Sequence, residues 1–335
     1  MACSSRRRRP WRHRLALLAG ASLVALGAGE GATRVWGAVH ERPGPTQFLD
    51  YDAGLGWRNR PRYAGRHQTD DFDVAVCFDA AGARIAADAA AEPPGARGGV
   101  LAIGDSTTFG WGVEAEQTFA ARLAGRLHVP VQNFGVSGYG TDQQLLRLRS
   151  LLAAPAPQLV IVTYQDNDVA EVLQQHAYGR YKPAFEPAGT AADLRLVGAP
   201  VPTSWWAEHS ELWRTVQKRL GAFETRTLAA DELARGRVLV RQLYQAMHQE
   251  CAAHGATLLL VFADADWLAT APATGGWPPT LDLTATFAAL RQHGALSFAQ
   301  DPHWLPHVHA AIATALADRI TAAGWLVGEA PDHRK

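Results

Sequence analysis

Two shortages limit what this sequence can be. Its three cysteines, Cys3, Cys77 and Cys251, are too few for a disulfide scaffold, and none forms the Cys-x-x-Cys pair typical of zinc sites. Lys plus Arg and Asp plus Glu both total 32, so no net positive charge points to nucleic acid as a partner. We expect no metal and no other cofactor, and a Cys77–Cys251 bridge is a minor alternative for an exported domain.

The basic residues are unevenly distributed. Six arginines lie at positions 6–9, 12 and 14, and the uncharged apolar run Leu15–Gly29 follows them. That run is shorter than the roughly 20 residues that span a bilayer, but it fits the roughly 7–15 apolar residues of a secretory signal. We expect residues 1–40 to form a basic N-terminus and a signal-anchor or signal-peptide helix.

The sequence leaves open whether this helix is kept or cleaved. In both cases the arginines stay in the cytosol and the rest of the chain lies outside it. A retained helix makes the chain a single-pass protein of the cell membrane, with the membrane as a partner. Cleavage near Gly27 or Gly29 makes it secreted or periplasmic.

The remaining chain has the composition of a globular protein, with 47% apolar and 19% charged residues. Residues 41–97 are irregular, with turns and short strands, and we expect them to form an extension packed on the core. From residue 98 to 328, apolar strands alternate with helices, which predicts an α/β domain with a central parallel sheet covered on both faces. The expected strands are VLAIGDS (100–106), VPVQNFGV (129–136), QLVIVTY (158–164), ATLLLVFAD (256–264) and a short LSFAQD (296–301).

The alternation stops between about residues 171 and 228, where no strand pattern holds. We expect an insertion over one edge of the sheet. Trp205, Trp206 and Trp213 lie in it. These rings could stack on sugars or pack against the sheet, and the sequence does not decide between the two.

Polar residues gather where the expected strands end. Gly104, Asp105 and Ser106 follow the first strand, NFGVSGYGTD follows the second, and QDND follows the third. Near the C-terminus the sequence continues with DPHWLPHVH. Carboxyl ends of parallel strands lie at one rim of the sheet. Serine, glycine, asparagine, aspartate and histidine therefore come together where a nucleophilic serine would need them.

These segments resemble the four motif blocks of the SGNH/GDSL hydrolase superfamily. The blocks are IGDSTTFGWG, NFGVSGYGTDQ, QDND and DPHW, and the GWRNRP segment resembles the lead-in of membrane-anchored bacterial members. The resemblance implies a three-layer α/β/α flavodoxin-like fold and a serine-dependent ester hydrolase that acts through an acyl-serine. It makes Ser106 the nucleophile, with Asp301 and His303 as its catalytic partners. The implied oxyanion donors are Ser106, Gly138 and Asn167.

The sequence also departs from the superfamily pattern. Gln165 stands where the third block usually has glycine. The spacing Asp-x-His in the last block resembles relatives that acetylate exopolysaccharides, but Leu305 and Val308 replace the Asn and Gly those relatives carry after it. The Gly-x-Ser-x-Gly elbow of α/β-hydrolases is missing around Ser106.

Some of these residues also have structural explanations. Gly138 could serve only a turn, and Asn167 could cap the next helix. His303, His307 and His309 could form a metal site, although their spacing is no established zinc signature.

We expect His303 to be the base. In an extended segment its side chain lies on the same face as that of Asp301, two residues earlier. His309 falls in the first turn of a helix, where the dipole disfavours imidazolium, and we expect it to be a structural donor to a nearby loop. His307 has no acid nearby in the sequence.

Three functions remain open. The first is an esterase that transfers an acyl group from an ester substrate to water. The second is an O-acyltransferase or acetylesterase acting on cell-surface polysaccharide. The third is an inactive module that binds acylated glycans. Intact Ser, Gly, Asn, Asp and His favour the first two.

Overall fold

The computed structural model of the chain describes residues 10–40, 42–88, 99–152, 157–187, 193–203, 209–221, 228–270 and 276–326. The chain forms two compact units. One combines Met1–Glu41 with Thr203–Thr225, and the other combines Arg42–Pro202 with Arg226–Lys335.

The first unit contains the long helix α1 (Pro10–His40) and the shorter helix α8 (Glu211–Gly221). The segment Trp11–Gly37 of α1 is long and apolar enough to cross a membrane, and none of it is buried. The helix therefore continues past the apolar run Leu15–Gly29 that the sequence marks. A secretory signal near an N-terminus meets the same criteria of length and composition, so the helix is compatible with both alternatives.

Glu30, which ends the apolar run, holds the start of α8. Its carboxylate accepts hydrogen bonds from Ser210 Oγ at 2.7 Å and from the backbone N–H groups of Glu211 at 3.0 Å and Leu212 at 3.1 Å. The first N–H groups of a helix have no partner within the helix, and a carboxylate there satisfies them. Glu30 therefore caps the N-terminus of α8.

The second unit is built on one eight-stranded sheet, in the order β14-β13-β8-β6-β7-β5-β4-β3. Five of its strands are parallel: β6 (Val100–Ile103), β7 (Val131–Asn133), β8 (Leu159–Thr163), β13 (Thr257–Phe262) and β14 (Thr280–Asp282). Numbered in chain order, they stand as 2-1-3-4-5, which is the flavodoxin-like arrangement. The predicted α/β fold class is confirmed.

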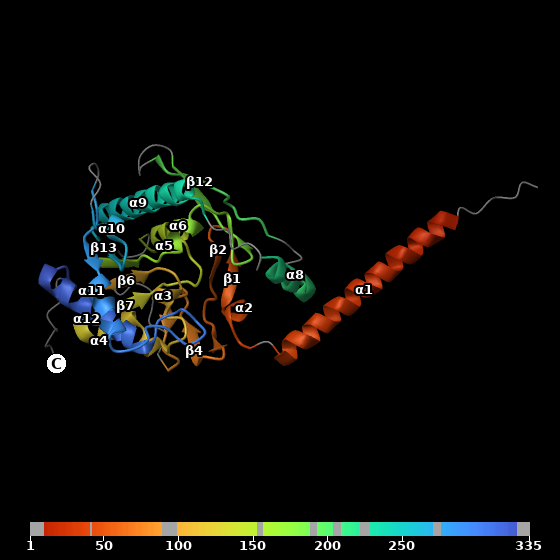
Figure 1. Cartoon of the computed structure of the whole chain (residues 1–335), viewed down its shortest axis with the longest axis horizontal. Coiled ribbons are helices and arrows are strands. Elements are labelled where there is room, and N and C mark those ends of the chain that lie inside the picture. Colours follow the sequence, from red (N-terminus) through yellow and green to blue (C-terminus); the bar gives the residue numbers. More distant parts are fainter. Residues whose placement is uncertain are drawn as a thin grey trace, which may run out of the picture. The chain divides into compact units, whose positions relative to one another are not determined.

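Helices cover both faces of this sheet, because successive residues of the inner strands point to opposite sides (Figure 1). Leu101 and Ile103 of β6 join one buried cluster with α5 (Thr141–Leu152) and α9 (Ala230–Ala253). Val100 and Ala102 join the other, with α4 (Phe119–Leu127), α11 (Thr284–Arg291) and α12 (Pro306–Ala323). Burial on both faces explains why the sequence of these strands is continuously apolar.

The expected parallel sheet is in fact mixed. Residues 41–97 extend the sheet beyond β7 with three antiparallel strands, β3 (Ala64–Gln68), β4 (Asp73–Phe78) and β5 (Arg84–Ile85). β5 pairs with β7, β4 with β5, and β3 with β4. The extension is therefore part of the sheet as well as packed on it. Ahead of these strands lie α2 (Pro45–Phe48) and the hairpin of β1 (Leu49–Asp52) and β2 (Gly56–Asn59).

Two further expectations were wrong. The segment LSFAQD forms no strand, only an isolated bridge between Ser297 and Trp304, and the fifth parallel strand is β14 instead. The region 171–228 contains strands after all. They form two small antiparallel pairs, β9 (His176–Ala177) with β10 (Arg180–Tyr181), and β11 (Ala184–Glu186) with β12 (Arg195–Val197).

The described part of the unit also contains four short elements: α3 (Ser106–Phe109), η1 (Ala115–Gln117), α6 (Asp168–Glu171) and α10 (Asp266–Ala269). Cys77 on β4 and Cys251 on α9 are buried free thiols, so the alternative of a disulfide between them is wrong. Trp205 and Trp206 lie outside the described residues, and Trp213 lies on α8 in the first unit, with 42% of its surface exposed.

Candidate functional site

The site begins where β6 ends at the centre of the sheet. Asp105 follows the strand, is buried, and accepts hydrogen bonds from the N–H and Oγ1 of Thr107 at 2.8 and 2.7 Å. These bonds fix the turn into α3, whose first residue is Ser106. Between β6 and β8 the chain order reverses, and such a switch point is where open α/β sheets bind their ligands.

Ser106, His303 and Asp301 lie in one hydrogen-bonded line. His303 Nε2 is 2.7 Å from Ser106 Oγ, and His303 Nδ1 is 2.5 Å from Asp301 Oδ1. The backbone N–H of His303 also donates to Asp301 Oδ1, at 2.9 Å. With a proton on Nδ1 held by the carboxylate, Nε2 can accept the serine proton, as a nucleophile with a general base requires.

Trp111 completes this line, and the sequence reasoning missed it. Its Nε1–H donates to Asp301 Oδ2 at 2.8 Å, and its ring stacks on that of His303 at 5.1 Å between centroids. Burial alone would raise the pKa of Asp301, but the hydrogen bonds from His303 and Trp111 outweigh it and lower the pKa. The carboxylate therefore stays charged beside the imidazole. The signal was present, since Trp111 stands within the block that carries Ser106.

Two backbone N–H groups at the site remain available for a reacting oxygen. Neither Ser106 N–H nor Gly138 N–H donates a hydrogen bond within the part of the chain that the structure describes. Gly138 has φ +77°, a conformation that other residues rarely adopt. A Cβ at this position would also come within 2.8 Å of the Tyr178 ring.

Asn167 follows β8 and precedes α6, but its side chain does not cap that helix. Instead, Asn167 Nδ2 donates to Glu171 Oε1 at 2.8 Å. The capping alternative for Asn167 is therefore wrong, and the amide is held by a carboxyl that the sequence reasoning did not consider.

Residues of the extension hold the two loops that carry Ser106 and Gly138. Arg84 is buried and donates to the carbonyl oxygens of Phe109, Gly110 and Val113, at 2.8, 2.5 and 2.6 Å. Trp57, in the GWRNRP segment, donates through Nε1 to the carbonyl of Ser137 at 2.9 Å.

The other two histidines of the C-terminal block have separate places. His309 is buried in the first turn of α12, and its Nδ1 accepts the N–H of Phe119 at 3.3 Å. The prediction that it donates to a loop is thus wrong. Burial lowers the pKa of His309 to about 3, so it is neutral. His307 is exposed. Among the described residues there is no group of three or more His, Cys, Asp and Glu side chains that could hold a metal ion.

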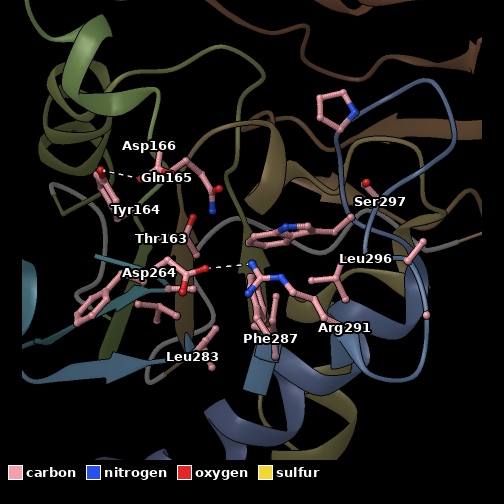
Figure 2. A pocket seen from close by; sticks show the side chains of 18 residues that line it. Thr163, Tyr164, Gln165, Asp166, Asp264, Leu283, Phe287, Arg291, Leu296 and Ser297 are labelled. Atoms are coloured by element: carbon pink, nitrogen blue, oxygen red, sulfur yellow. Dashed lines mark hydrogen bonds and ion pairs between the residues drawn. The ribbon is translucent and has the colours of Figure 1, made fainter. Parts of the chain in front are cut away.

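A cavity of about 470 Å³ flanks this line of residues. Its lining includes Gln165, before Asn167, and Pro302 and Trp304, on either side of His303; Ser106, His303 and Asn167 themselves are outside the lining. Figure 2 shows Gln165, Asp264 and Arg291 pointing into the same space, with Arg291 Nη2 3.0 Å from Asp264 Oδ2. The lining thus combines hydrogen-bonding groups with aromatic and aliphatic side chains. Gln165 replaces the glycine that is usual in the third motif block, and its side chain therefore becomes part of the cavity lining.

A sequence profile of the GDSL-like lipase/acylhydrolase family matches residues 102–292. The match includes Ser106, Gly138 and Asn167 and ends before Asp301 and His303. No curated protein sequence matches the chain.

Several solved structures are similar to the chain at low identity. TesA is 16% identical with a TM-score of 0.39, over 67% of this chain and 98% of that one. A putative lipolytic protein of the G-D-S-L family from Desulfitobacterium hafniense is 14% identical with a TM-score of 0.38, over 65% and 97%. A catalytic mutant of Axe2, an acetylxylan esterase from Geobacillus stearothermophilus, is 14% identical with a TM-score of 0.37, over 69% and 99%.

Proposed function

We propose that this chain, which belongs to the GDSL-like lipase/acylhydrolase family and acts on ester bonds, works through an acyl-serine intermediate on Ser106. The observation that carries this proposal is the position of His303. Its two ring nitrogens lie 2.7 Å from Ser106 Oγ and 2.5 Å from Asp301 Oδ1. One imidazole therefore links the nucleophile to the acid that orients it.

Ser106 Oγ attacks the ester carbonyl as His303 Nε2 takes the hydroxyl proton. Asp301, held by Trp111, stabilises the imidazolium. The N–H groups of Ser106 and Gly138 and the amide of Asn167 stabilise the oxyanion, and the acyl–oxygen bond then breaks as His303 returns its proton to the leaving alcohol. A second hydroxyl, activated by His303 in the same way, attacks the acyl-serine and frees Ser106.

We place this reaction outside the cytosol. Support comes from the apolar run Leu15–Gly29 of α1, which follows six arginines, because positive residues stay on the cytosolic side. A retained α1 keeps the enzyme at the membrane, and cleavage releases it.

The second hydroxyl defines two candidate activities. Water makes the protein an esterase. A sugar hydroxyl makes it an O-acyltransferase of surface polysaccharide, and the cavity beside His303 favours this second candidate. Its lining holds an amide, a carboxylate and a guanidinium, which can hydrogen-bond to sugar hydroxyls. It also holds the indole ring of Trp304, which can stack on the face of a sugar.

The test is a panel of p-nitrophenyl esters of increasing acyl length, with and without an acetylatable polysaccharide, followed by mass spectrometry of the polysaccharide. An esterase releases free acid at the same rate in both conditions. An acyltransferase moves the acyl mass onto the polysaccharide and consumes the ester faster when it is present. Absence of turnover with every ester and acceptor would instead support a module that only binds glycans.

A further inference from the structure

The amide of Asn167 is held in place by a carboxyl that is not part of the four motif blocks. Glu171 is one turn further along the chain, at the end of α6, and its Oε1 accepts the Asn167 Nδ2–H at 2.8 Å. An amide has two N–H groups. The bond to Glu171 uses one of them and sets the direction of the other.

Glu171 is in turn held by a tyrosine on a strained turn. Tyr178 Oη donates to the same Glu171 Oε1. Tyr178 and Gly179 are the two central residues of the β9–β10 hairpin, with φ of +54° and +73°. Such a turn favours Asn, Asp or Gly at both positions, and a bulky residue there costs free energy. The ring of this tyrosine also lies against Gly138, where a Cβ would meet it at 2.8 Å.

The cluster of Asn167, Glu171 and Tyr178 has little positive charge around it to balance the Glu171 carboxylate. Glu171 is 6% exposed, and its Oε2 has no hydrogen-bond partner among the described residues. The ionisable groups around it are Asp168 on its own helix, Asp105 after β6, Tyr178, and the buried ion pair of Asp142 and Lys182. Burial raises the pKa of Glu171 to about 7, against the opposing hydrogen bonds from Asn167 and Tyr178.

We propose that Glu171 and Tyr178 are positioning residues that aim the Asn167 amide at the oxyanion. The proposal rests on the function proposed above. A carboxyl oxygen that accepts from both side chains ties Asn167 to the hairpin that covers Gly138. Two of the three oxyanion donors are thereby fixed relative to each other before substrate binds, which is the preorganisation that such donors need.

A double-mutant cycle in kcat tests the link between Glu171 and Asn167. Asn167→Ala should lower kcat by about 10²–10³-fold with little change in KM. Glu171→Ala alone should lower kcat by about 10–100-fold, by analogy with the range found when groups that orient metal ligands are removed. In the Asn167→Ala background, Glu171→Ala should cost less than about twofold, because the amide it orients is gone.

Two further variants separate positioning from folding. Glu171→Gln keeps a carbonyl oxygen that can accept both hydrogen bonds, so its kcat should stay within a few-fold of wild type. Glu186→Gln is the matched control, since Glu186 is exposed in the same segment of the chain and pairs with Arg195.

Tyr178→Asn gives an independent test. Asparagine suits the turn, so the melting temperature should stay equal or rise, while the lost hydroxyl should lower kcat about tenfold. Tyr178→Phe keeps the ring over Gly138 and should show the same loss of kcat.

Additive effects of Glu171→Ala and Asn167→Ala would overturn the proposal, and so would full activity of Tyr178→Asn and Tyr178→Phe. An Asn167→Ala enzyme with unchanged kcat would also overturn it, while leaving the acyl-serine function intact. Failure of that function is a separate result, namely unchanged turnover by Ser106→Ala.

Discussion

His303 and His309 lie on the same short segment but in opposite environments. His303 contacts Ser106 and Asp301, whereas His309 is buried against Phe119 and neutral. His303→Ala should therefore lower kcat by at least about 10³-fold without loss of stability. His309→Ala should mainly lower the melting temperature, because it leaves a cavity and an unpaired N–H.

Steady-state kinetics and thermal unfolding of the two purified variants decide between these roles. An active His303→Ala enzyme beside a folded but inactive His309→Ala enzyme would reverse the assignment of the base.

Glu171 should make stability depend on pH. Its pKa is raised from 4.5 to about 7, so the folded state holds this proton more tightly than the unfolded chain does. The resulting stabilisation is complete below pH 4.5 and is lost as the pH rises through 7. Glu171→Gln has no such proton and should reduce the fall in melting temperature between about pH 5 and pH 8.

Thermal unfolding at a series of pH values measures this, with Glu186→Gln as the control that keeps the wild-type fall. If Glu171→Gln and wild type lose the same stability over this range, Glu171 is already ionised at low pH in the folded enzyme.

At the scale of elements, strands β3–β5 and the catalytic loop depend on each other through Arg84. This buried guanidinium satisfies three carbonyl oxygens in the loop that follows Ser106. Arg84→Met removes three hydrogen bonds from a charged donor, each worth about 1.5–3 kcal/mol, and leaves the carbonyl of Val113 without another donor among the described residues. We expect unfolding free energy to fall by about 3 kcal/mol or more, together with kcat.

Urea denaturation measures the loss. Arg66→Met is the matched control, because Arg66 lies on β3 but is exposed and pairs with Asp73, so its change should be within about 0.5 kcal/mol. Equal stabilities of the two variants would show that Arg84 does not support the loop.

The parts of the fold that were predictable share one physical property. Strands β6, β8 and β13 are buried on both faces. They are therefore apolar except for Thr163 and Thr257 at their ends, and they stand out from the helices between them. β14 has only three residues, and β9 and β10 have two each, which is too short for any periodicity. The pairing of β14 with β13 is a tertiary contact that the local sequence of β14 does not contain, whereas β9 and β10 pair locally across Tyr178 and Gly179.

The site divides in the same way. Ser106, Gly138, Asn167, Asp301 and His303 stand in motifs with fixed order and were named from them. Arg84 and Tyr178 act through hydrogen bonds to residues on other elements, and Glu171 accepts hydrogen bonds from Asn167, four residues earlier, and from Tyr178. No motif in the local sequence marks these three residues. Only Trp111 had a local signal, its place in the block of Ser106.

At the scale of the whole molecule, the division into two units predicts where the chain can be cut. A fragment that begins at Arg42 lacks α1 but keeps every strand of the sheet. It should be soluble and should retain ester turnover, whereas a fragment beginning at residue 99 loses β1–β5 and should be unstable. The full-length chain should fractionate with membranes because of α1.

Cell fractionation and ester turnover of the three proteins test this. Recovery of the uncleaved full-length chain in the soluble fraction would contradict membrane anchoring. An active, stable fragment from residue 99 would contradict the structural role of the extension.

The central claim is that Ser106 is the nucleophile, and covalent labelling of the full chain tests it most directly. A fluorophosphonate reacts with a serine activated by a neighbouring base, and intact-mass spectrometry counts the adducts. We predict one adduct per chain in the wild type, on the peptide that contains Ser106, and none in Ser106→Ala. Labelling that persists in Ser106→Ala, or that falls on another serine of the wild type, would contradict the account.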